Sequence, residues 1–142
     1  MDLDKIIKLA LAEDIGSGDI STQYLELEPL NSNAYMIAKA EGVLAGVDVA
    51  KAVFLQVDGS LKITLYRKDG DRVVPGNEIM RLEGKASSIL QGERTALNFL
   101  QLLSGIATLT DSYVQRLKGT KARLLDTRKT TPLLRGLEKY AV

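Results

Sequence analysis

The chain of 142 residues contains no cysteine, no histidine and no tryptophan. The missing cysteines exclude disulfides, thiolate metal sites and a cysteine nucleophile, and the missing histidines remove the commonest general base and zinc ligand. Only five tyrosines and two phenylalanines are present, so a base-stacking platform for single-stranded nucleic acid is not expected. Chemistry in this chain must therefore use lysine, arginine, carboxylate or hydroxyl side chains.

An excess of charge of one sign is also lacking, because 19 basic and 18 acidic residues leave a net charge of +1. This balance disfavours partners such as nucleic acid or an anionic membrane surface. The amino terminus is acidic and no apolar run reaches membrane-spanning length, so we expect a cytoplasmic protein. Residues 1–100 carry 11 basic and 15 acidic side chains, whereas residues 101–142 carry 8 and 3. An anion site is therefore expected in the last third of the chain.

With 45% apolar residues, the chain can form a core, and its hydrophobic periodicity predicts the elements around it. Helices are predicted at residues 3–13 and 47–56, then from a Ser87 cap to about residue 103, and at 106–118. Strands are predicted near residues 35–38, 43–45, 61–65, 73–74 and 79–82, the first two as a hairpin or meander. This order indicates an α+β layer, a small antiparallel sheet covered by helices. A later strand at 122–127, followed by a helix from Pro132, is typical of a parallel α/β fold.

Two stretches combine charge with an unusual position. In the helix predicted from Ser87, Glu93 falls in the middle of the apolar stripe and Arg94 on its border, which indicates either a functional site or a structural ion pair. The acidic, glycine-rich stretch at 13–19 suits either a solvated turn or a cation loop, although it lacks the ligand spacing of a calcium hand. No metal ligand is assigned from the sequence.

The segment Asp126-Thr127-Arg128-Lys129-Thr130-Thr131 leaves the carboxyl end of the predicted late strand. In parallel α/β folds such residues build the site. Two adjacent cations among hydroxyls, ahead of a helix, suit phosphate or carboxylate groups. The alternative is a solvated basic turn.

The stretches at 13–22, 40–46, 92–108 and 125–132 carry a specific combination of motifs. Gly92-Glu93-Arg94-Thr95 is followed by Asp126-Thr127-Arg128-Lys129-Thr130 about thirty residues later. In this order the stretches resemble the quinolinate phosphoribosyltransferases, also called nicotinate-nucleotide pyrophosphorylases (carboxylating), from end to end. The resemblance implies an α+β amino-terminal sandwich over residues 1–105 that covers substrate and forms dimers. Residues 106–142 would then hold the first βα unit of a type II phosphoribosyltransferase α/β barrel, truncated here.

The resemblance also implies an activity, a transferase of NAD biosynthesis. Quinolinate and 5-phosphoribosyl 1-pyrophosphate would give nicotinate mononucleotide, pyrophosphate and carbon dioxide. Arg94 would bind substrate in the neighbouring subunit of a homodimer or higher homo-oligomer, while Thr127, Arg128 and Lys129 would bind it in their own subunit. Lys129 would also act as the catalytic residue beside the reacting centre. Mg²⁺ would accompany the pyrophosphate, with its ligands outside this chain.

The family pattern continues after Val142 into a glycine-rich His-Arg segment and further phosphate-binding residues, so the chain by itself is expected to be inactive. Two alternatives remain open at this point. One is a molybdenum-associated paralogue with the same fold. The other is a non-catalytic biotinyl-like or lipoyl-like module, suggested by the turn pattern at 70–79, although this stretch lacks a lysine-bearing hairpin tip.

Overall fold

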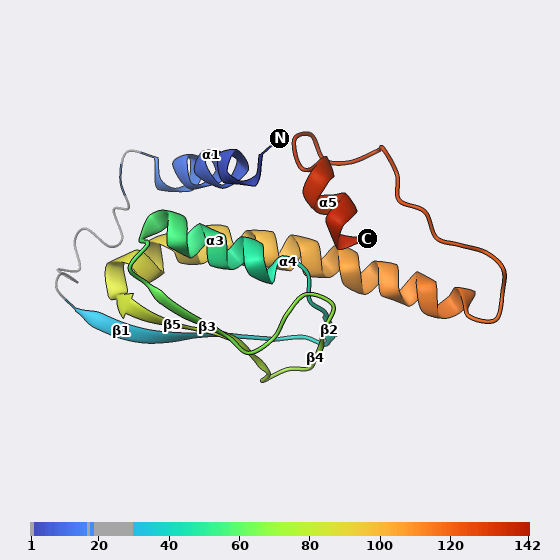
Figure 1. Cartoon of the computed structure of the whole chain (residues 1–142), viewed down its shortest axis with the longest axis horizontal. Helices are drawn as coiled ribbons and strands as arrows, with labels where there is room; N and C mark the ends of the chain where they lie inside the picture. Colours follow the sequence, from blue (N-terminus) through green and yellow to red (C-terminus); the bar gives the residue numbers. More distant parts are fainter. Residues whose placement is uncertain (1, 17, 19–29) are drawn as a thin grey trace.

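The computed structural model describes residues 2–16, 18 and 30–142. Its elements in chain order are α1 (Leu3–Ile15), β1 (Asn31–Ile37), β2 (Gly42–Val43), α3 (Val47–Val57), β3 (Lys62–Leu65), β4 (Arg72–Val73), β5 (Glu78–Lys85), α4 (Ala86–Leu117) and α5 (Arg135–Ala141). The strands form one layer, α3 and α4 cover it, and α1 lies on the outer side of these two helices (Figure 1). The predicted sandwich of sheet and helices is confirmed.

The sheet is antiparallel, with strand order β1-β5-β3, and β2 and β4 form a separate pair. Central β5 contributes Met80 and Leu82, which are 0% and 2% exposed. The predicted hairpin between the first two strands is wrong, because β1 pairs with β5 and β2 pairs with β4. After β1, the Ala38 backbone bonds to Gly76 and Asn77 instead. The chain then continues to β2, which pairs with β4.

Gly46 precedes helix α3 at its capping position, and its φ of 92° is the left-handed conformation that glycine adopts without strain. The Val47 amide at the start of the helix donates to Asp69 Oδ1 over 2.8 Å. Ala50, Val53 and Phe54 are at most 1% exposed, and α3 packs closely on α4. The helix predicted at 47–56 is therefore confirmed, and the apolar spacing of its buried face explains it.

Helix α4 is continuous over 32 residues and follows β5 directly, with Lys85 in the capping position. The two predicted helices are thus one, and Ser87 lies inside its first turn. Gly105 lies between the two predicted helices, and glycine inside a helix costs about 1 kcal/mol. Leu103 and Ala107 on either side of it are 0% and 9% exposed. Their burial outweighs the weak local preference.

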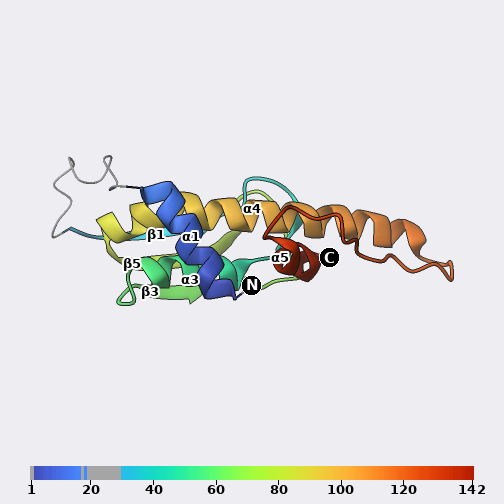
Figure 2. The same ribbon diagram turned by 90° about the horizontal axis from the view of Figure 1, so that it is seen from above.

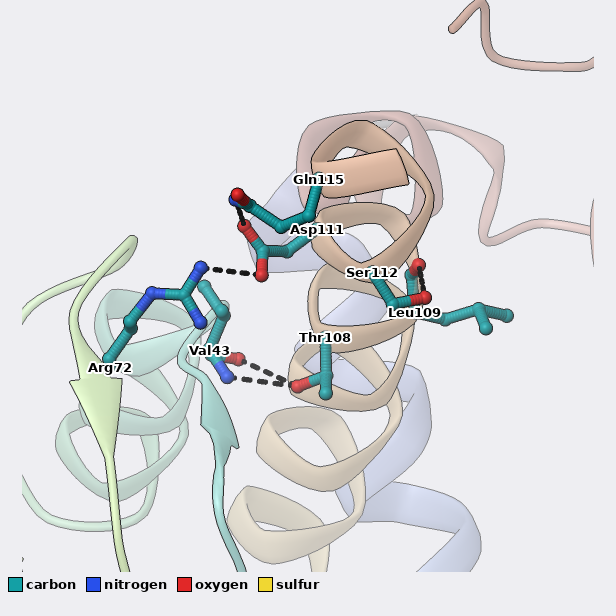
Figure 3. A network of polar contacts seen from close by, with 7 residues as sticks. All are labelled: Val43, Arg72, Thr108, Leu109, Asp111, Ser112 and Gln115. Atoms are coloured by element: carbon teal, nitrogen blue, oxygen red, sulfur yellow. Dashed lines mark hydrogen bonds and ion pairs between the residues drawn. The ribbon is translucent and has the colours of Figure 1, made fainter. Parts of the chain in front are cut away.

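Two hydroxyl groups of α4 bind the backbone of the β2 region. The Val43 amide donates to Thr108 Oγ1 over 2.9 Å, and the Ala45 amide donates to Ser104 Oγ over 3.1 Å (Figure 3 shows the first contact). Ser104 and Thr108 are four residues apart and so lie on the same face of the helix. Their hydroxyls therefore bind alternate residues of the extended chain, Ala45 and Val43. Gly42 allows this approach, since a Cβ there would lie 2.7 Å from Thr108 Oγ1.

One turn further along α4, an ion pair ties the helix to β4. Arg72 Nη2 lies 2.6 Å from Asp111 Oδ2, and the Gln115 amide donates to Asp111 Oδ1 over 2.8 Å (Figure 3). The hydrogen bonds from Gln115 and Arg72 lower the pKa of Asp111. The second half of α4 is therefore held against the β2–β4 pair.

The chain after α4 runs back beside the second half of that helix and ends in α5 (Figures 1 and 2). Residues 122–127 form no strand, so the strand predicted there is wrong for the described structure. A strand needs a neighbour for its backbone groups, and none of the described strands pairs with this stretch. Leu125 is accordingly 83% exposed. The helix predicted from Pro132 does form, three residues later, as α5.

Helix α5 is attached to the sandwich in two ways, by packing on α4 and by a side-chain hydrogen bond. Ala141 is 5% exposed, and the helix packs on α4. The Tyr140 hydroxyl donates to Asp69 Oδ2, so one carboxylate holds both α5 and the first turn of α3. Among the described residues, no helix is long and apolar enough to cross a membrane.

Candidate functional site

Arg94 lies two turns into α4, and its neighbours in the chain determine how it is presented. Gly92 is buried, and a Cβ on it would lie 2.8 Å from the Phe54 ring. Thr95 is 4% exposed and faces the core. The Arg94 side chain is 71% exposed, and its Nη1 lies 2.8 Å from Asp14 Oδ1 at the end of α1. Within the Gly92–Thr95 motif, two residues thus place the helix and Arg94 points outward.

Glu93 does not lie in the buried stripe of α4, contrary to the prediction from its spacing. It is exposed. The buried face of α4 runs through Gly92, Ala96 and Leu103 instead. The apolar spacing did not reveal Gly92 as part of this face, because glycine has no side chain. Arg94 does form an ion pair, with Asp14, and its role in binding substrate stays a prediction.

The second group of candidates, Thr127, Arg128 and Lys129, lies in the irregular segment before α5, and all three are exposed. The Lys129 amide donates to Thr127 Oγ1 over 3.1 Å, which closes a local turn. Within the described part of the chain, neither Arg128 nor Lys129 forms an ion pair. Their charges therefore remain available to an anion in solution.

Contacts with α5 hold this segment at both ends. Lys139 Nζ lies 2.8 Å from Asp126 Oδ2, and Arg135 Nε donates to Thr130 Oγ1 over 3.2 Å. The Thr131 amide donates to both carboxylate oxygens of Glu138. The neighbours of Arg128 and Lys129 are thus occupied by structural contacts, whereas the charged groups of these two residues are not.

The structure does not bring the two groups of candidates together. The first turns of α4 and the segment 122–131 lie well apart in both ribbon views (Figures 1 and 2). No described hydrogen bond or ion pair joins Arg94 to residues 127–129. One described chain therefore presents two separate cationic positions rather than one closed pocket.

A hollow among the described residues lies elsewhere, between β1 and α4. It has a volume of about 950 Å³ and a mostly apolar lining, and its charged lining residues are Lys39, Glu41 and Glu93. Large apolar hollows are the default place for a ligand. The lining of this hollow does not include Arg94, Arg128 or Lys129, and it contains more negative than positive side chains. The hollow therefore does not suit a dianion.

Sequence reasoning missed Asp14, the residue that contacts Arg94 from 80 positions away. A signal was present, because an acidic residue in the last turn of a helix opposes the helix dipole, and Asp14 occupies that turn of α1. The rest of the proposed cation loop at 13–19 includes residues 17 and 19, which lie outside the described residues. Among the described residues, no group of three acidic side chains could hold a metal ion.

Two family models match the chain in succession. The quinolinate phosphoribosyl transferase N-terminal domain matches residues 19–104, and the C-terminal domain of the same family matches residues 106–142. Their boundary falls at Gly105, inside the continuous helix α4. The match names neither a biotinyl nor a lipoyl module.

Curated relatives agree with the family models. A probable nicotinate-nucleotide pyrophosphorylase (carboxylating) of Bacillus subtilis is 43% identical over 142 residues, which are 100% of this chain and 49% of the relative. The chloroplastic nicotinate-nucleotide pyrophosphorylase (carboxylating) of Arabidopsis thaliana is 44% identical over 99% of this chain and 40% of its own length. The chain thus spans about half the length, or less, of the curated relatives it matches.

Solved structures share the fold as well as the sequence. The crystal structure of NadC from Streptococcus pyogenes superimposes with a TM-score of 0.94 at 42% identity and covers 98% of this chain and 50% of its own. The nicotinate-nucleotide pyrophosphorylase of Francisella tularensis gives a TM-score of 0.92 at 41% identity, with 98% and 50% covered. The two motifs, the fold and these matches agree, and the chain belongs to the quinolinate phosphoribosyltransferase family.

Proposed function

We propose that this chain is the quinolinate-binding half of a quinolinate phosphoribosyltransferase. The reaction would join quinolinate to 5-phosphoribosyl 1-pyrophosphate and release pyrophosphate and carbon dioxide, leaving nicotinate mononucleotide for NAD synthesis. The observation that carries the proposal is the exposure of the cations in both family motifs. Arg94 is 71% exposed, and Arg128 and Lys129 are exposed, while the residues around them are committed to packing or to contacts with α5.

The chemistry of these side chains suits the proposed substrate. Quinolinate carries two carboxylates, and a guanidinium group binds a carboxylate with two parallel hydrogen bonds. Arg94 and Arg128 would each bind a carboxylate in this way. Lys129 would supply a point charge beside the phosphate groups and the reacting carbon. Catalysis would then consist of positioning and electrostatic stabilisation, without a covalent intermediate on the protein.

The separation of the two cationic positions supports a site shared between subunits. Arg94 and residues 127–129 lie apart in one chain (Figures 1 and 2), so a single small molecule would not reach both in one copy. A symmetric homodimer could place Arg94 of one subunit against the segment 127–129 of the other. We place this assembly in the cytoplasm.

A magnesium ion is the expected companion of the pyrophosphate group, since it would neutralise the leaving oxygens. The described residues hold no group of three acidic side chains that could bind it. These residues therefore do not fit a magnesium site of their own, and no step of the proposed reaction is assigned to the metal in this chain.

A chimera tests the proposal. Residues 1–142 replace the matching half of the Bacillus subtilis relative, which is 43% identical over this range, and product formation from quinolinate and 5-phosphoribosyl 1-pyrophosphate is measured. The chimera should be active, and the isolated 142-residue chain should not be. Arg94→Ala and Arg128→Ala should each lower kcat/KM at least about thirtyfold, since each leaves a carboxylate without its charged partner.

Arg123→Ala is the matched control, because Arg123 is an exposed arginine of the same segment without a proposed role. It should leave kcat/KM within about twofold. A folded chimera without quinolinate-dependent product would reject the proposal and favour the molybdenum-associated paralogue. Pyrophosphate release by the isolated chain would show that the described half contains more of the site than we propose.

A further inference from the structure

The ion pair between Asp14 and Arg94 joins the end of α1 to the beginning of α4. Arg94 Nη1 and Asp14 Oδ1 lie 2.8 Å apart. The two side chains differ in exposure, 22% for Asp14 against 71% for Arg94. The carboxylate thus lies on the inner side of the pair and the guanidinium on the outer side, where most of its surface faces solvent.

Local rules do not favour an aspartate at position 14. The carboxyl end of a helix carries partial negative charge, and the last turn of α1 contains no basic residue that would offset it. An exposed ion pair also contributes little to folding stability. Residues that break a local rule without a gain in stability tend to mark functional sites, so Asp14 calls for another explanation.

The helix that carries Asp14 is held firmly on the sandwich. Ile6, Ile7 and Leu11 are at most 8% exposed, and α1 packs on both α3 and α4. A recess of about 40 Å³ lies beside the pair, lined by Asp14, Ile15, Leu90, Gln91 and Arg94. It has room for about one water molecule. A ligand of the size of quinolinate can therefore reach Arg94 only from the exposed side.

We infer that Asp14 is a positioning residue that holds the Arg94 guanidinium outward for the carboxylate of the substrate. This inference rests on the proposed function and adds to it a residue outside both cationic motifs. An arginine side chain loses considerable rotamer freedom when it binds. A partner that restricts it in advance reduces this loss and so increases affinity without touching the ligand.

The first test uses the 142-residue chain and its arginine guanidinium groups, observed by nitrogen NMR. In the wild-type chain the Arg94 guanidinium, assigned through Arg94→Lys, should rotate slowly. Asp14→Ala should make it rotate faster than in the wild-type chain, while Glu13→Ala should leave it unchanged. Glu13 is the matched control, since it is exposed and adjacent. An Arg94 signal that does not respond to Asp14→Ala overturns the inference.

The second test measures steady-state kinetics in the chimera described above. Asp14→Ala should raise the KM for quinolinate about three- to tenfold, the effect expected from the lost ordering of one long side chain. The KM for 5-phosphoribosyl 1-pyrophosphate should stay unchanged, and kcat should change less than twofold. Asp14→Asn should lie between wild type and Asp14→Ala, because an amide oxygen still accepts a hydrogen bond but carries no charge.

The outcomes separate this inference from the proposed function. A wild-type chimera without activity counts against the proposed function. An active chimera in which Arg94→Ala is impaired but Asp14→Ala behaves like Glu13→Ala overturns the inference alone. A lower KM for quinolinate in Asp14→Asn would also overturn it, since Asp14 would then compete with the substrate for Arg94. An equal rise in both KM values would indicate a merely structural role.

Discussion

Gly92 shows how an absent side chain determines where Arg94 lies. The ring of Phe54 occupies the space that a Cβ at position 92 would need, at 2.8 Å. Because α3 and α4 approach each other closely at this point, the contact fixes how closely the first turns of α4 pack on the sandwich. The position of Arg94, two residues later in the same helix, therefore depends on the contact between Gly92 and Phe54.

Gly92→Ala should therefore destabilise the fold, even though alanine is the better helix former. Overpacking a buried contact costs about 1–3 kcal/mol, against a gain of up to about 1 kcal/mol in helix propensity. Gly105→Ala in the same helix meets nothing within 4 Å, so it should stabilise by about 0.5–1 kcal/mol. Urea unfolding of both variants measures the two signs. Equal stabilisation by both substitutions would show that Phe54 yields without cost.

The candidate cations could be predicted from the sequence because arginine and lysine in these motifs stand out by their chemistry. Arg94, Arg128 and Lys129 are all exposed in the structure, as a binding role requires. Asp14 could not be paired with Arg94 in advance, since 80 residues separate them. The sequence around either residue does not indicate that α1 and α4 contact each other.

Helix α5 is attached to the sandwich by its packing on α4 and by one polar side-chain contact. It spans seven residues, too few to be stable by themselves. The Tyr140 hydroxyl of α5 donates to Asp69, which also accepts a hydrogen bond from the Val47 amide at the start of α3. The hydrogen bond to Asp69 raises the pKa of Tyr140 to about 12, because it favours the protonated phenol.

Tyr140→Phe should lower the free energy of unfolding by about 1 kcal/mol or less, since the side chain is largely exposed. The ordinary pKa of tyrosine, near 10 in the unfolded chain, lies below the folded value of about 12. The contribution is thus complete below about pH 10 and is lost as the pH rises towards 12. The difference in stability between wild type and variant should follow this course.

Tyr113→Phe provides the control for this comparison, because Tyr113 is 50% exposed and lies on α4 without a described hydrogen bond. It should leave stability unchanged at every pH. A difference for Tyr140→Phe that persists undiminished above pH 12 would show that ring packing, rather than the hydroxyl, attaches α5.

Among the elements, those with a buried apolar face were predictable and those decided by distant pairing were not. Helix α3 follows from the spacing of Ala50, Val53 and Phe54. The partners of β1 and β2 depend on where β5 and β4 lie, which no local pattern states. The stretch 122–127 has strand-like composition, but it finds no neighbour among the described strands.

At the scale of the whole molecule, the two cationic positions and the apolar hollow are three separate features. The hollow between β1 and α4 has a volume of about 950 Å³, and neither cationic position faces it. A site that uses both cationic positions therefore needs more than the described surface of one chain. This arrangement leads to a test of the proposed dimer.

Two variants of the chimera should complement each other when they are mixed. In a symmetric dimer with shared sites, a hybrid of Arg94→Ala and Arg128→Ala subunits has one doubly defective site and one intact site. After unfolding and refolding together, the mixture should regain about one quarter of wild-type activity, because half of its dimers are hybrids. Either variant refolded alone should stay at least about thirtyfold below the wild-type kcat/KM. No recovery in the mixture would place both residues in the site of one subunit.

The unbroken course of α4 has a mechanical consequence. At 1.5 Å per residue its 32 residues make a rod about 48 Å long. Phe54 fixes its first turns, and the contacts of Thr108 and Asp111 with the β2–β4 pair fix its second half. The segment with Arg128 and Lys129 is attached to this rod through α5, which packs on α4. A tilt of the rod by about 5° would displace one end by about 4 Å relative to the other, whereas errors of about 1 Å in a site can cost roughly a hundredfold in rate. The two sets of contacts thus act as two bearings that fix the direction of α4, and the position of the distant cations depends on both.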